Sequence, residues 1–401
     1  MANVSSSNGL EKRPKLRFPG FDEPWKRTEI GDVCEQLHET IDPSIIPDEY
    51  FTEYSMPAFD NEQTASSVQG KEMNSVRKIL SKPCVLVNKL NVRKKRVWLI
   101  PTPEQNAVAS AEFVPLASDY INLEFLLYSS LTDRFTNYLL NCSSGSSNSQ
   151  KRVTPDVILN YVLEVPTRAE QNKISDCLSL LDKRIGEQVR LIKYLKKYKR
   201  GLLDKVFPPK KDLPFPTVRL SEMADFLQGL TYSPSDVANS GYLVLRSSNI
   251  QNAALSFNDC VYVDMEIPTC LQVKQGDIIM CVRNGSKKLV GKSAMIPCEM
   301  PMTTWGAFMM VIRSKICGSY IYQYLNSQAF YSQVFKDTGT ATINQITKGI
   351  LNECELPLPS ENERDRITAL LETFDKRIEN SYSSLLRLKD LRKSLLQQLF
   401  I

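Results

Sequence analysis

Basic and amide side chains cluster in two turns of the sequence, where they could contact a polyanion. The first turn holds Lys89, Asn91, Arg93, Lys94 and Lys95, and the second holds Arg283, Asn284 and Lys287. Lysine and arginine suit phosphate contacts, and arginine, asparagine and glutamine also suit base edges. A solvated charge run explains either turn alone equally well, but the recurrence of the turn favours nucleic-acid binding.

Two short polar loops could add contacts to bases. Residues 147–152 and 342–345 occupy nearly equivalent places, and they contain Asn148, Gln150, Asn344 and Gln345. Alone, these loops would be interpreted as turns. Beside a basic hairpin, their hydrogen-bonding side chains indicate readers of DNA.

The sequence offers no catalytic constellation. Motifs for nucleotide binding, for serine hydrolysis and for S-adenosylmethionine binding are absent, and Asp277, the nearest approach to a nuclease carboxylate, lacks acidic partners. His38 is the only histidine, and none of the ten cysteines belongs to a CxxC pair, so no metal site is expected. We therefore predict a non-catalytic chain that binds no cofactor of its own.

The composition is that of a folded protein with more than one domain. The 401 residues are 42% hydrophobic and 24% charged, with a formal net charge of +5, and about 100–200 residues per domain predicts two or three domains. No stretch approaches the roughly 20 apolar residues of a membrane helix, and the first residues lack the apolar region of a secretory signal. Together with the scattered cysteines, these features predict a cytoplasmic protein with no membrane partner.

A tandem repeat organises the chain. Residues 163–207 align without a gap to residues 356–400 at a constant offset of 193, with 14 of 45 positions identical. The identical positions include the block Asp182–Ile185 against Asp375–Ile378. In both copies a proline and a hydroxyl residue precede a glutamate at Glu170 and Glu363, in the manner of a capping box.

Both copies carry apolar residues at alternating steps of four and three, the period of a coiled-coil seam. The predicted seam consists of Ile174, Leu178, Leu181, Ile185, Ile192, Leu195, Ile367, Leu371, Phe374, Ile378, Leu385 and Leu388. Polar residues interrupt it at equivalent places, at Gln188/Ser381 and Lys199/Arg392. The pattern predicts two packed helices of about 50 Å each; two unrelated amphipathic helices on separate cores are the alternative.

The segments before the helices show strand patterns and helical patterns of mixed α/β character. We predict an α+β chain with two α/β globules in tandem, each followed by a long helix. The expected parts are a flexible tail at 1–17, a globule at 18–163, a helix with a proline-rich linker at 164–211, a second globule at 212–358 and a second helix at 359–401.

In their order and duplication, these features resemble the specificity subunit of type I restriction–modification systems. The resemblance covers nearly the whole chain. It rests on Leu16–Val33, on the GDIIM element at Gly276, on Thr340–Thr347, and on the helix openings LEVPTRAEQNKI and LPLPSENERDRI with the twin DKRI blocks. The first globule departs from the family pattern, because it has Lys82–Val85 where the second has Gln275–Ile278.

The resemblance implies a non-catalytic subunit with two target-recognition domains, 18–163 and 212–358, that each bind half of a bipartite double-stranded DNA site. It implies that the helices form an antiparallel coiled coil, hold the domains apart and dock two modification (methyltransferase) subunits. Those partners would methylate adenine N6 with S-adenosylmethionine, and restriction (motor-nuclease) subunits would use ATP and Mg, in a bacterial or archaeal cytoplasm.

For this function, lysines should set affinity and salt dependence, and asparagine, glutamine and arginine should set base preference. The predicted DNA contacts are Lys89, Asn91, Arg93, Lys94, Lys95, Asn148, Gln150, Arg246, Asn249, Arg283, Asn284, Lys287, Asn344 and Gln345. Two alternatives stay open. The chain could serve another type of restriction–methyltransferase, or it could be a helical adaptor that binds no DNA.

Overall fold

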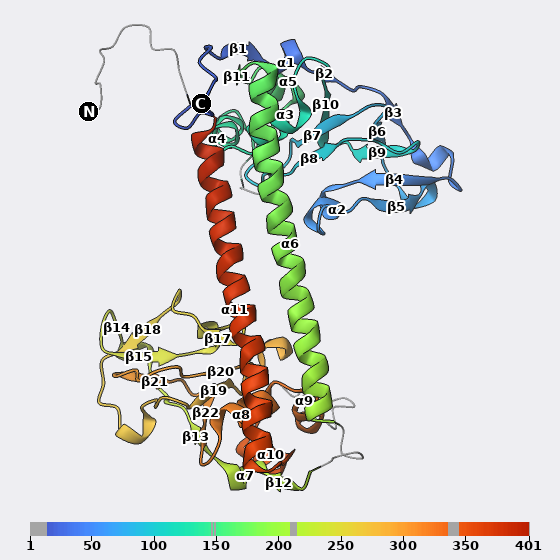
Figure 1. Ribbon diagram of the computed structural model, residues 1–401. Helices are drawn as coiled ribbons and strands as arrows, with labels where there is room; N and C mark the ends of the chain where they lie inside the picture. Colours follow the sequence, from blue (N-terminus) through green and yellow to red (C-terminus); the bar gives the residue numbers. More distant parts are fainter. Residues whose placement is uncertain (1–13, 146, 148–149, 209–214, 336–344, 401) are drawn as a thin grey trace, which may run out of the picture. The chain divides into compact units, whose positions relative to one another are not determined.

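The computed structural model of the chain describes residues 14–145, 147, 150–208, 215–335 and 345–400 (Figure 1). The chain divides into two compact units. Unit 1 comprises residues up to Val189 together with Ser383–Ile401, and unit 2 comprises Arg190–Tyr382. Because these boundaries fall inside the two long helices, each unit contains one part of each helix.

Unit 1 combines three sheets with short helices. Its four-stranded sheet has the order β2 (Glu35–Gln36), β10 (Phe113–Ala117), β7 (Cys84–Asn88), β8 (Val97–Ile100). Its five-stranded sheet has the order β3 (Thr40–Ile41), β6 (Arg77–Ile79), β9 (Ala107–Ser110), β4 (Tyr50–Tyr54), β5 (Ser66–Gln69). Unit 1 also contains the strand pair β1 (Lys26–Glu29) and β11 (Val162–Val165), and the helices α1 (Ile30–Val33), α2 (Met56–Asp60), α3 (Leu123–Ser130), α4 (Asp133–Asn141) and α5 (Pro155–Leu159).

Unit 2 repeats much of this plan. One four-stranded sheet has the order β13 (Ala224–Gln228), β22 (Met309–Ser314), β19 (Ile278–Cys281), β20 (Ser293–Met295), and the other has the order β14 (Val237–Ala238), β18 (Val261–Val263), β15 (Tyr242–Leu245), β21 (Thr303–Trp305). The two-stranded sheets pair β12 (Thr217–Arg219) with β23 (Glu355–Pro357) and β16 (Ile250–Gln251) with β17 (Ala254–Leu255). The short helices are α7 (Leu220–Met223), α8 (Gly318–Leu325), α9 (Gln328–Val334) and α10 (Lys348–Glu353).

The repeat therefore extends from the helices into the globules. The sheet β2-β10-β7-β8 of unit 1 corresponds to β13-β22-β19-β20 of unit 2, and each unit also has one parallel strand pair, β4 with β9 and β15 with β21. The predicted tandem α+β arrangement is confirmed.

A buried ion pair explains why the two globules look different at the GDIIM element. Asp277 is buried, and its carboxylate accepts from Arg313 Nε at 2.8 Å and Nη2 at 2.7 Å. The strand registers place Cys84 and Ala117 at the corresponding positions of unit 1, where both are buried in an apolar cluster. An apolar contact thus replaces a charged one, and in both cases the residues stabilise the sheet.

The two long helices are α6 (Arg168–Val206) and α11 (Glu361–Gln398), drawn in green and red in Figure 1. In unit 1, Ile174 and Leu178 of α6 share a core with Leu396 and Leu399 at the end of the chain. In unit 2, Leu203 near the end of α6 shares a core with Leu371, near the start of α11, and with partly buried Ile367. The start of each helix thus lies against the end of the other, so the predicted antiparallel packing is confirmed.

The burial pattern follows the predicted seam. None of the twelve seam residues is exposed, and the polar interruptions Gln188, Ser381, Lys199 and Arg392 are also buried or half-buried. Lys199 and Arg392 each form an ion pair with an aspartate of the other helix. A charged seam residue is therefore accommodated by a partner across the interface.

The beginning of the described chain is tied to the helices of unit 1. The Leu16 amide donates to the carbonyl of Gln398 at 2.9 Å, and Arg17 forms a two-point ion pair with Glu170, with both distances 2.8 Å. These two residues were predicted to belong to a flexible tail, whereas residues 1–13 lie outside the described part. Because the Glu170 carboxylate binds Arg17, it does not bind the capping residue of α6. Of the two predicted capping boxes, only that of α11 has this contact, in which Glu363 accepts from the N–H and the hydroxyl of Ser360.

Candidate nucleic-acid interface

The basic turn of unit 1 connects β7 to β8 and is held in shape from within. The Asn88 side chain accepts from the Leu90 amide at 3.3 Å and donates to the Leu90 carbonyl. Asn91 follows with φ of 55°, in the left-handed region that asparagine tolerates better than most residues. The turn therefore has a defined backbone on which its side chains can be presented.

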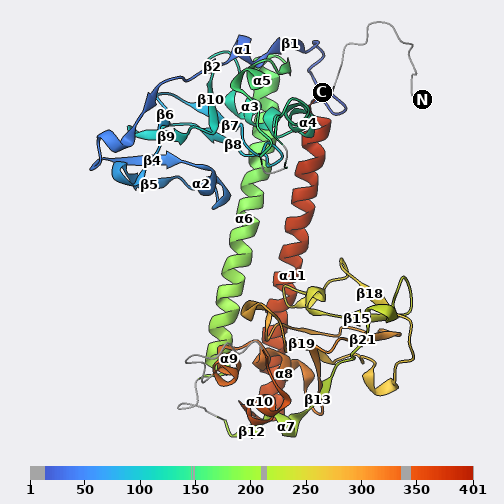
Figure 2. The ribbon, with the colours of Figure 1, turned by 180° about the vertical axis from the view of Figure 1, so that it is seen from behind.

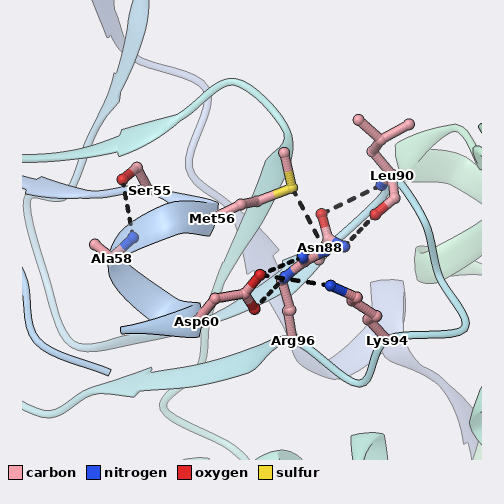
Figure 3. A network of polar contacts seen from close by, with 8 residues as sticks. All are labelled: Ser55, Met56, Ala58, Asp60, Asn88, Leu90, Lys94 and Arg96. Carbon is pink, nitrogen blue, oxygen red and sulfur yellow. Dashed lines mark hydrogen bonds and ion pairs between the residues drawn. The ribbon is translucent and has the colours of Figure 1, made fainter. Parts of the chain in front are cut away.

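Helix α2 anchors the far side of this turn, as Figure 3 shows. Arg96 is buried, and its guanidinium donates to Asp60 at 2.9 Å from Nε and 2.6 Å from Nη2. Lys94 Nζ lies 3.6 Å from the same carboxylate. These hydrogen bonds, chiefly those from Arg96, hold the pKa of Asp60 below its usual value. Arg96 is thus a structural cation, and Lys94 is partly neutralised.

The other cations of the turn differ in whether their charged groups already have a partner in the protein. Lys95 donates to the carbonyl of Leu131 at 2.8 Å and to Asp133 at 2.5 Å, so its ammonium group is already satisfied. Lys89 is half-buried, whereas Arg93 is exposed and has no ion pair among the described residues. Arg93 is therefore the cation of this turn that is most available to a ligand.

The structure joins the basic turn to the polar loop that was predicted to lie beside it. The Asn91 amide donates to the carbonyl of Lys151 at 2.7 Å, and the Val153 amide donates to the carbonyl of Lys89 at 3.0 Å. Leu90 and Arg152 form an isolated antiparallel bridge between these hydrogen bonds. Gln150 is exposed in this loop, whereas Asn148 lies outside the described residues.

Unit 2 contains the same junction at the repeat offset of 193. Arg283 and Gln345 form the isolated antiparallel bridge, and the Ile346 amide donates to the carbonyl of Val282 at 2.7 Å. Arg283 and Gln345 are both exposed, and Asn344 lies outside the described residues. Two predicted DNA contacts, 62 residues apart in sequence, are thus brought side by side.

An exposed aromatic ring accompanies this junction. Phe308 is 59% exposed, and the Arg283 guanidinium lies 5.3 Å from its ring centroid. The side-chain amide of Asn284 donates to Ser247 Oγ at 3.2 Å, and this hydrogen bond connects the junction to the loop after β15. Arg246 in that loop is paired with Asp259 at 2.9 Å. Arg246, Arg283, Asn284 and Gln345 therefore belong to one continuous region.

Two hollows flank Phe308, whose side chain lines both. The larger, of about 720 Å³, is also lined by Tyr232, Arg246 and Ser248. Buried polar atoms of two of these residues, Arg246 Nε and Ser248 Oγ, have no hydrogen-bond partner. The smaller, of about 180 Å³, is lined by Gln228, Arg283, Gln345 and Lys348, among others. The surface thus combines unsatisfied polar groups with an apolar ring.

Two predicted contacts have a different environment. Asn249 is fully buried. Its side-chain amide accepts from the backbone N–H of Arg246 and donates to the backbone carbonyls of Ser256 and Asp259. Asn249 therefore shapes the loop and does not reach a base. Lys287 is exposed in a 3₁₀ turn, with its ammonium group 5.9 Å from the Phe335 ring centroid.

The sequence patterns missed several residues of this region. Phe308, Ser247, Ser248 and Lys348 line the two hollows. Phe308 directly precedes β22, which begins at Met309, so its side chain lies at a strand end. Trp305 is fully buried, and its indole N–H donates to the carbonyl of Leu227, so this ring belongs to the core and is not available to stack on a base.

Neither a metal site nor a membrane span is found in the described part. Within it, no group of three or more histidine, cysteine, aspartate or glutamate residues could hold a metal ion. No helix in it is both long enough and apolar enough to cross a membrane.

Comparison with known proteins gives consistent matches. Residues 214–387 match the family model described as "Type I restriction modification DNA specificity domain". The chain is 26% identical over 186 residues to the type I restriction enzyme StySPI specificity subunit of Salmonella potsdam, covering 44% of this chain and 40% of the relative. It is 26% identical over 171 residues to the EcoKI specificity subunit of Escherichia coli K12, covering 40% and 36%. The chain thus matches less than half the length of these two relatives.

A third relative and two solved structures match over most of their length. The MjaVIII specificity subunit of Methanocaldococcus jannaschii is 22% identical over 392 residues, covering 91% of this chain and 88% of the relative. A structure described for complex assembly and conformational transition of the type I R-M system aligns with TM-score 0.60 at 21% identity, covering 96% and 99%. The S subunit from M. genitalium aligns with TM-score 0.60 at 14% identity, covering 97% and 99%. These structural likenesses concern the fold.

Proposed function

We propose that this chain, which belongs to the specificity subunits of type I restriction–modification systems, chooses the DNA sequence on which partner subunits act. It is a non-catalytic subunit. Each unit contributes one recognition surface, and together the two surfaces bind a bipartite site in double-stranded DNA.

The observation that carries the proposal is the junction found in both units. In each, a basic turn is bridged to a polar loop at positions related by the repeat offset of 193, Leu90 with Arg152 and Arg283 with Gln345. A packed core alone would not require cations and amides to gather at such a junction twice. Phosphate contacts and base contacts from one surface do require this mixture.

The two kinds of side chain have different roles in this function. Exposed cations such as Arg93 and Lys348 bind phosphates and fix the protein on the duplex. Arg283, Asn284 and Gln345 reach base edges, because their planar groups match the donor and acceptor patterns of the major groove. Phe308 stacks on the Arg283 guanidinium and supplies an apolar contact beside it.

The two half-sites and the partners follow from the same proposal. Two half-sites bound from one face of B-DNA lie about 10 base pairs apart, centre to centre. Two modification subunits bound to the helices use S-adenosylmethionine to methylate adenine N6. Restriction subunits with ATP and Mg add cleavage, inside a bacterial or archaeal cell.

The proposal is tested by DNA binding in the presence of competitor. The full chain is incubated with a randomised duplex library and excess unrelated DNA, and the bound fraction is sequenced. A split motif with an unspecified gap is expected, and Arg283→Ala should change one half of it only. Binding without any sequence preference, or no binding, would favour the adaptor function. Asp119→Ala, which removes an exposed carboxylate outside these surfaces, serves as the control.

A further inference from the structure

We infer that the outer face of α6 in unit 2 binds the phosphodiester backbone of duplex DNA, outside the bases that are read. This outer face consists of Arg190, Lys193, Tyr194, Lys197, Gly201 and Lys205. The inference rests on the proposed DNA-binding function. It assigns a surface to the strong positive charge of α6, which the two recognition surfaces do not use.

The charge of α6 is concentrated in its second half. Residues Arg190–Val206 contain seven lysines and arginines against one carboxylate, Asp204. The first part of α11, Glu361–Tyr382, contains four basic and six acidic residues. This half of α6 therefore has a net charge of +6 and the first part of α11 a net charge of −2, so the two together retain a net charge of +4.

Only part of this charge is used inside unit 2. Lys199 pairs with Asp375, Lys196 lies 4.9 Å from the centroid of the Tyr382 ring, and Arg200 donates to Gln328. In contrast, the side chains of the four cations of the outer face form no hydrogen bond or ion pair with any described residue. These four are Arg190, Lys193, Lys197 and Lys205.

Helical spacing gathers the unpaired cations on one side. At 3.6 residues per turn, positions 190, 193, 197, 201 and 205 lie along one stripe, and the seam residues Ile192, Leu195 and Lys199 lie on the opposite side. All residues of the outer face are exposed. The stripe is about 22 Å long at 1.5 Å per residue, which is enough to face several phosphates of a duplex. Figure 2 shows α6 from behind.

A hollow in the outer face adds shape to the charge. Its volume is about 530 Å³, and it extends from the outer face toward the seam, because it is lined by Tyr194, Lys197, Tyr198, Gly201 and Lys205 together with Leu195 and Leu202, all from α6. Tyr194 is 68% exposed. A Cβ atom added at Gly201 would meet nothing within 4 Å, so packing does not require glycine there. Glycine inside a helix is costly, and here it leaves the backbone open between two lysines.

The chemistry of the outer face favours a polyanion over an apolar partner. Flexible lysines at intervals of one or two turns bind phosphates without regard to sequence, and the tyrosine hydroxyl can donate to a phosphate oxygen. An acidic protein surface has the same charge and is the alternative that the experiment must separate.

The test uses the full chain and a 30-base-pair duplex of arbitrary sequence. Binding constants are measured over a range of salt concentrations for the wild type, for the triple variant Lys193→Gln, Lys197→Gln, Lys205→Gln, and for a control triple variant. The control changes Lys376, Lys389 and Lys393 to Gln, which removes the same charge from exposed positions of α11. Thermal unfolding of all three proteins checks that they remain folded.

The slope of log K against log salt should fall in magnitude by about 3 in the outer-face variant and by less than 1 in the control. The preference for the target selected from the randomised library over this arbitrary duplex, measured in the same way, should stay within about threefold of wild type. Equal slopes in the two variants would overturn the inference. So would an unchanged slope accompanied by weaker binding of the methyltransferase subunit, since the face would then serve a protein. A wild type that binds DNA without any sequence preference would refute the proposed function. The salt slopes of the outer-face variant and the control variant would still show whether the outer face binds DNA phosphates.

A second pair of variants separates charge from folding. Gly201→Glu and Gly201→Gln place side chains of equal size in the hollow, and both should stabilise the helix. Only the glutamate should weaken DNA binding, by about tenfold at low salt. Equal affinities for the two variants would contradict phosphate binding at this hollow.

Discussion

Arg392 of α11 donates from Nε and Nη2 to the carboxylate of Asp182 in α6. The repeat contains an equivalent pair, Lys199 with Asp375. At the repeat offset of 193, Asp375 corresponds to Asp182 and Lys199 corresponds to Arg392. Each aspartate also accepts from the preceding globule, from Tyr128 at 3.1 Å in unit 1 and from Gln323 at 2.7 Å in unit 2. These aspartates therefore connect seam to globule in both units.

The Asp182–Arg392 pair should contribute modestly to stability. In a double-mutant cycle of Asp182→Ala and Arg392→Ala, we expect a coupling energy of about 1 kcal/mol, because the pair is partly exposed. Urea unfolding measures it. Asp375→Ala and Lys199→Ala form the matched cycle in unit 2, and a coupling indistinguishable from zero in both cycles would show that the seam does not depend on these pairs.

The Arg17–Glu170 pair should contribute more to the free energy of unfolding than the Asp182–Arg392 pair does. Glu170 is fully buried, so Arg17→Ala leaves a carboxylate without its counter-charge, and we expect unfolding to become easier by about 3–5 kcal/mol. Lys26→Ala, which removes an exposed cation of the same unit that forms no ion pair with any described residue, is the control. A loss below about 1 kcal/mol for Arg17→Ala would mean that the described N-terminal segment adds little to unit 1.

The Asp60–Arg96 pair predicts a pH dependence. Since these hydrogen bonds lower the pKa of Asp60 in the folded protein, their contribution is present above the unfolded value of about 3.9 and is lost as the pH falls through the lower folded value. The difference in unfolding free energy between wild type and Asp60→Asn should therefore be constant above about pH 5 and shrink below about pH 4. A difference that grew with acidification would contradict the arrangement in Figure 3.

Asn249 and Arg283 should separate a structural role from a contact role. Asn249→Ala removes a buried amide that bonds three backbone groups, so we expect about 1–3 kcal/mol of lost stability. Arg283→Ala should leave the melting temperature nearly unchanged and cost about 1–3 kcal/mol of DNA affinity, with relaxed preference at one base position. Calorimetry measures the stability of both variants, and binding to single-substitution duplexes measures their DNA affinity and base preference. If Arg283→Ala lost stability and Asn249→Ala lost only DNA affinity, the two assigned roles would be reversed.

The periodic features of the fold were predictable from the sequence, because the seam positions of both helices follow one another at steps of three or four residues. The junctions were only partly predictable. Turn composition identified Arg283 and Gln345 separately, but their pairing depends on long-range strand register. The burial of Asn249, which was predicted as a DNA contact, and the exposure of Phe308 could not be predicted, because both follow from tertiary packing and not from the polar or apolar type of the residue.

The most direct test of the account is to express the chain with its methyltransferase partner and to map N6-methyladenine across the host DNA by long-read sequencing. We predict a split motif with an unspecified gap that disappears when this chain is omitted. Arg283→Ala should alter one half of the motif and leave the other half intact. No motif despite a stable complex, or a simultaneous change in both halves, would contradict the assignment of one recognition surface to each unit.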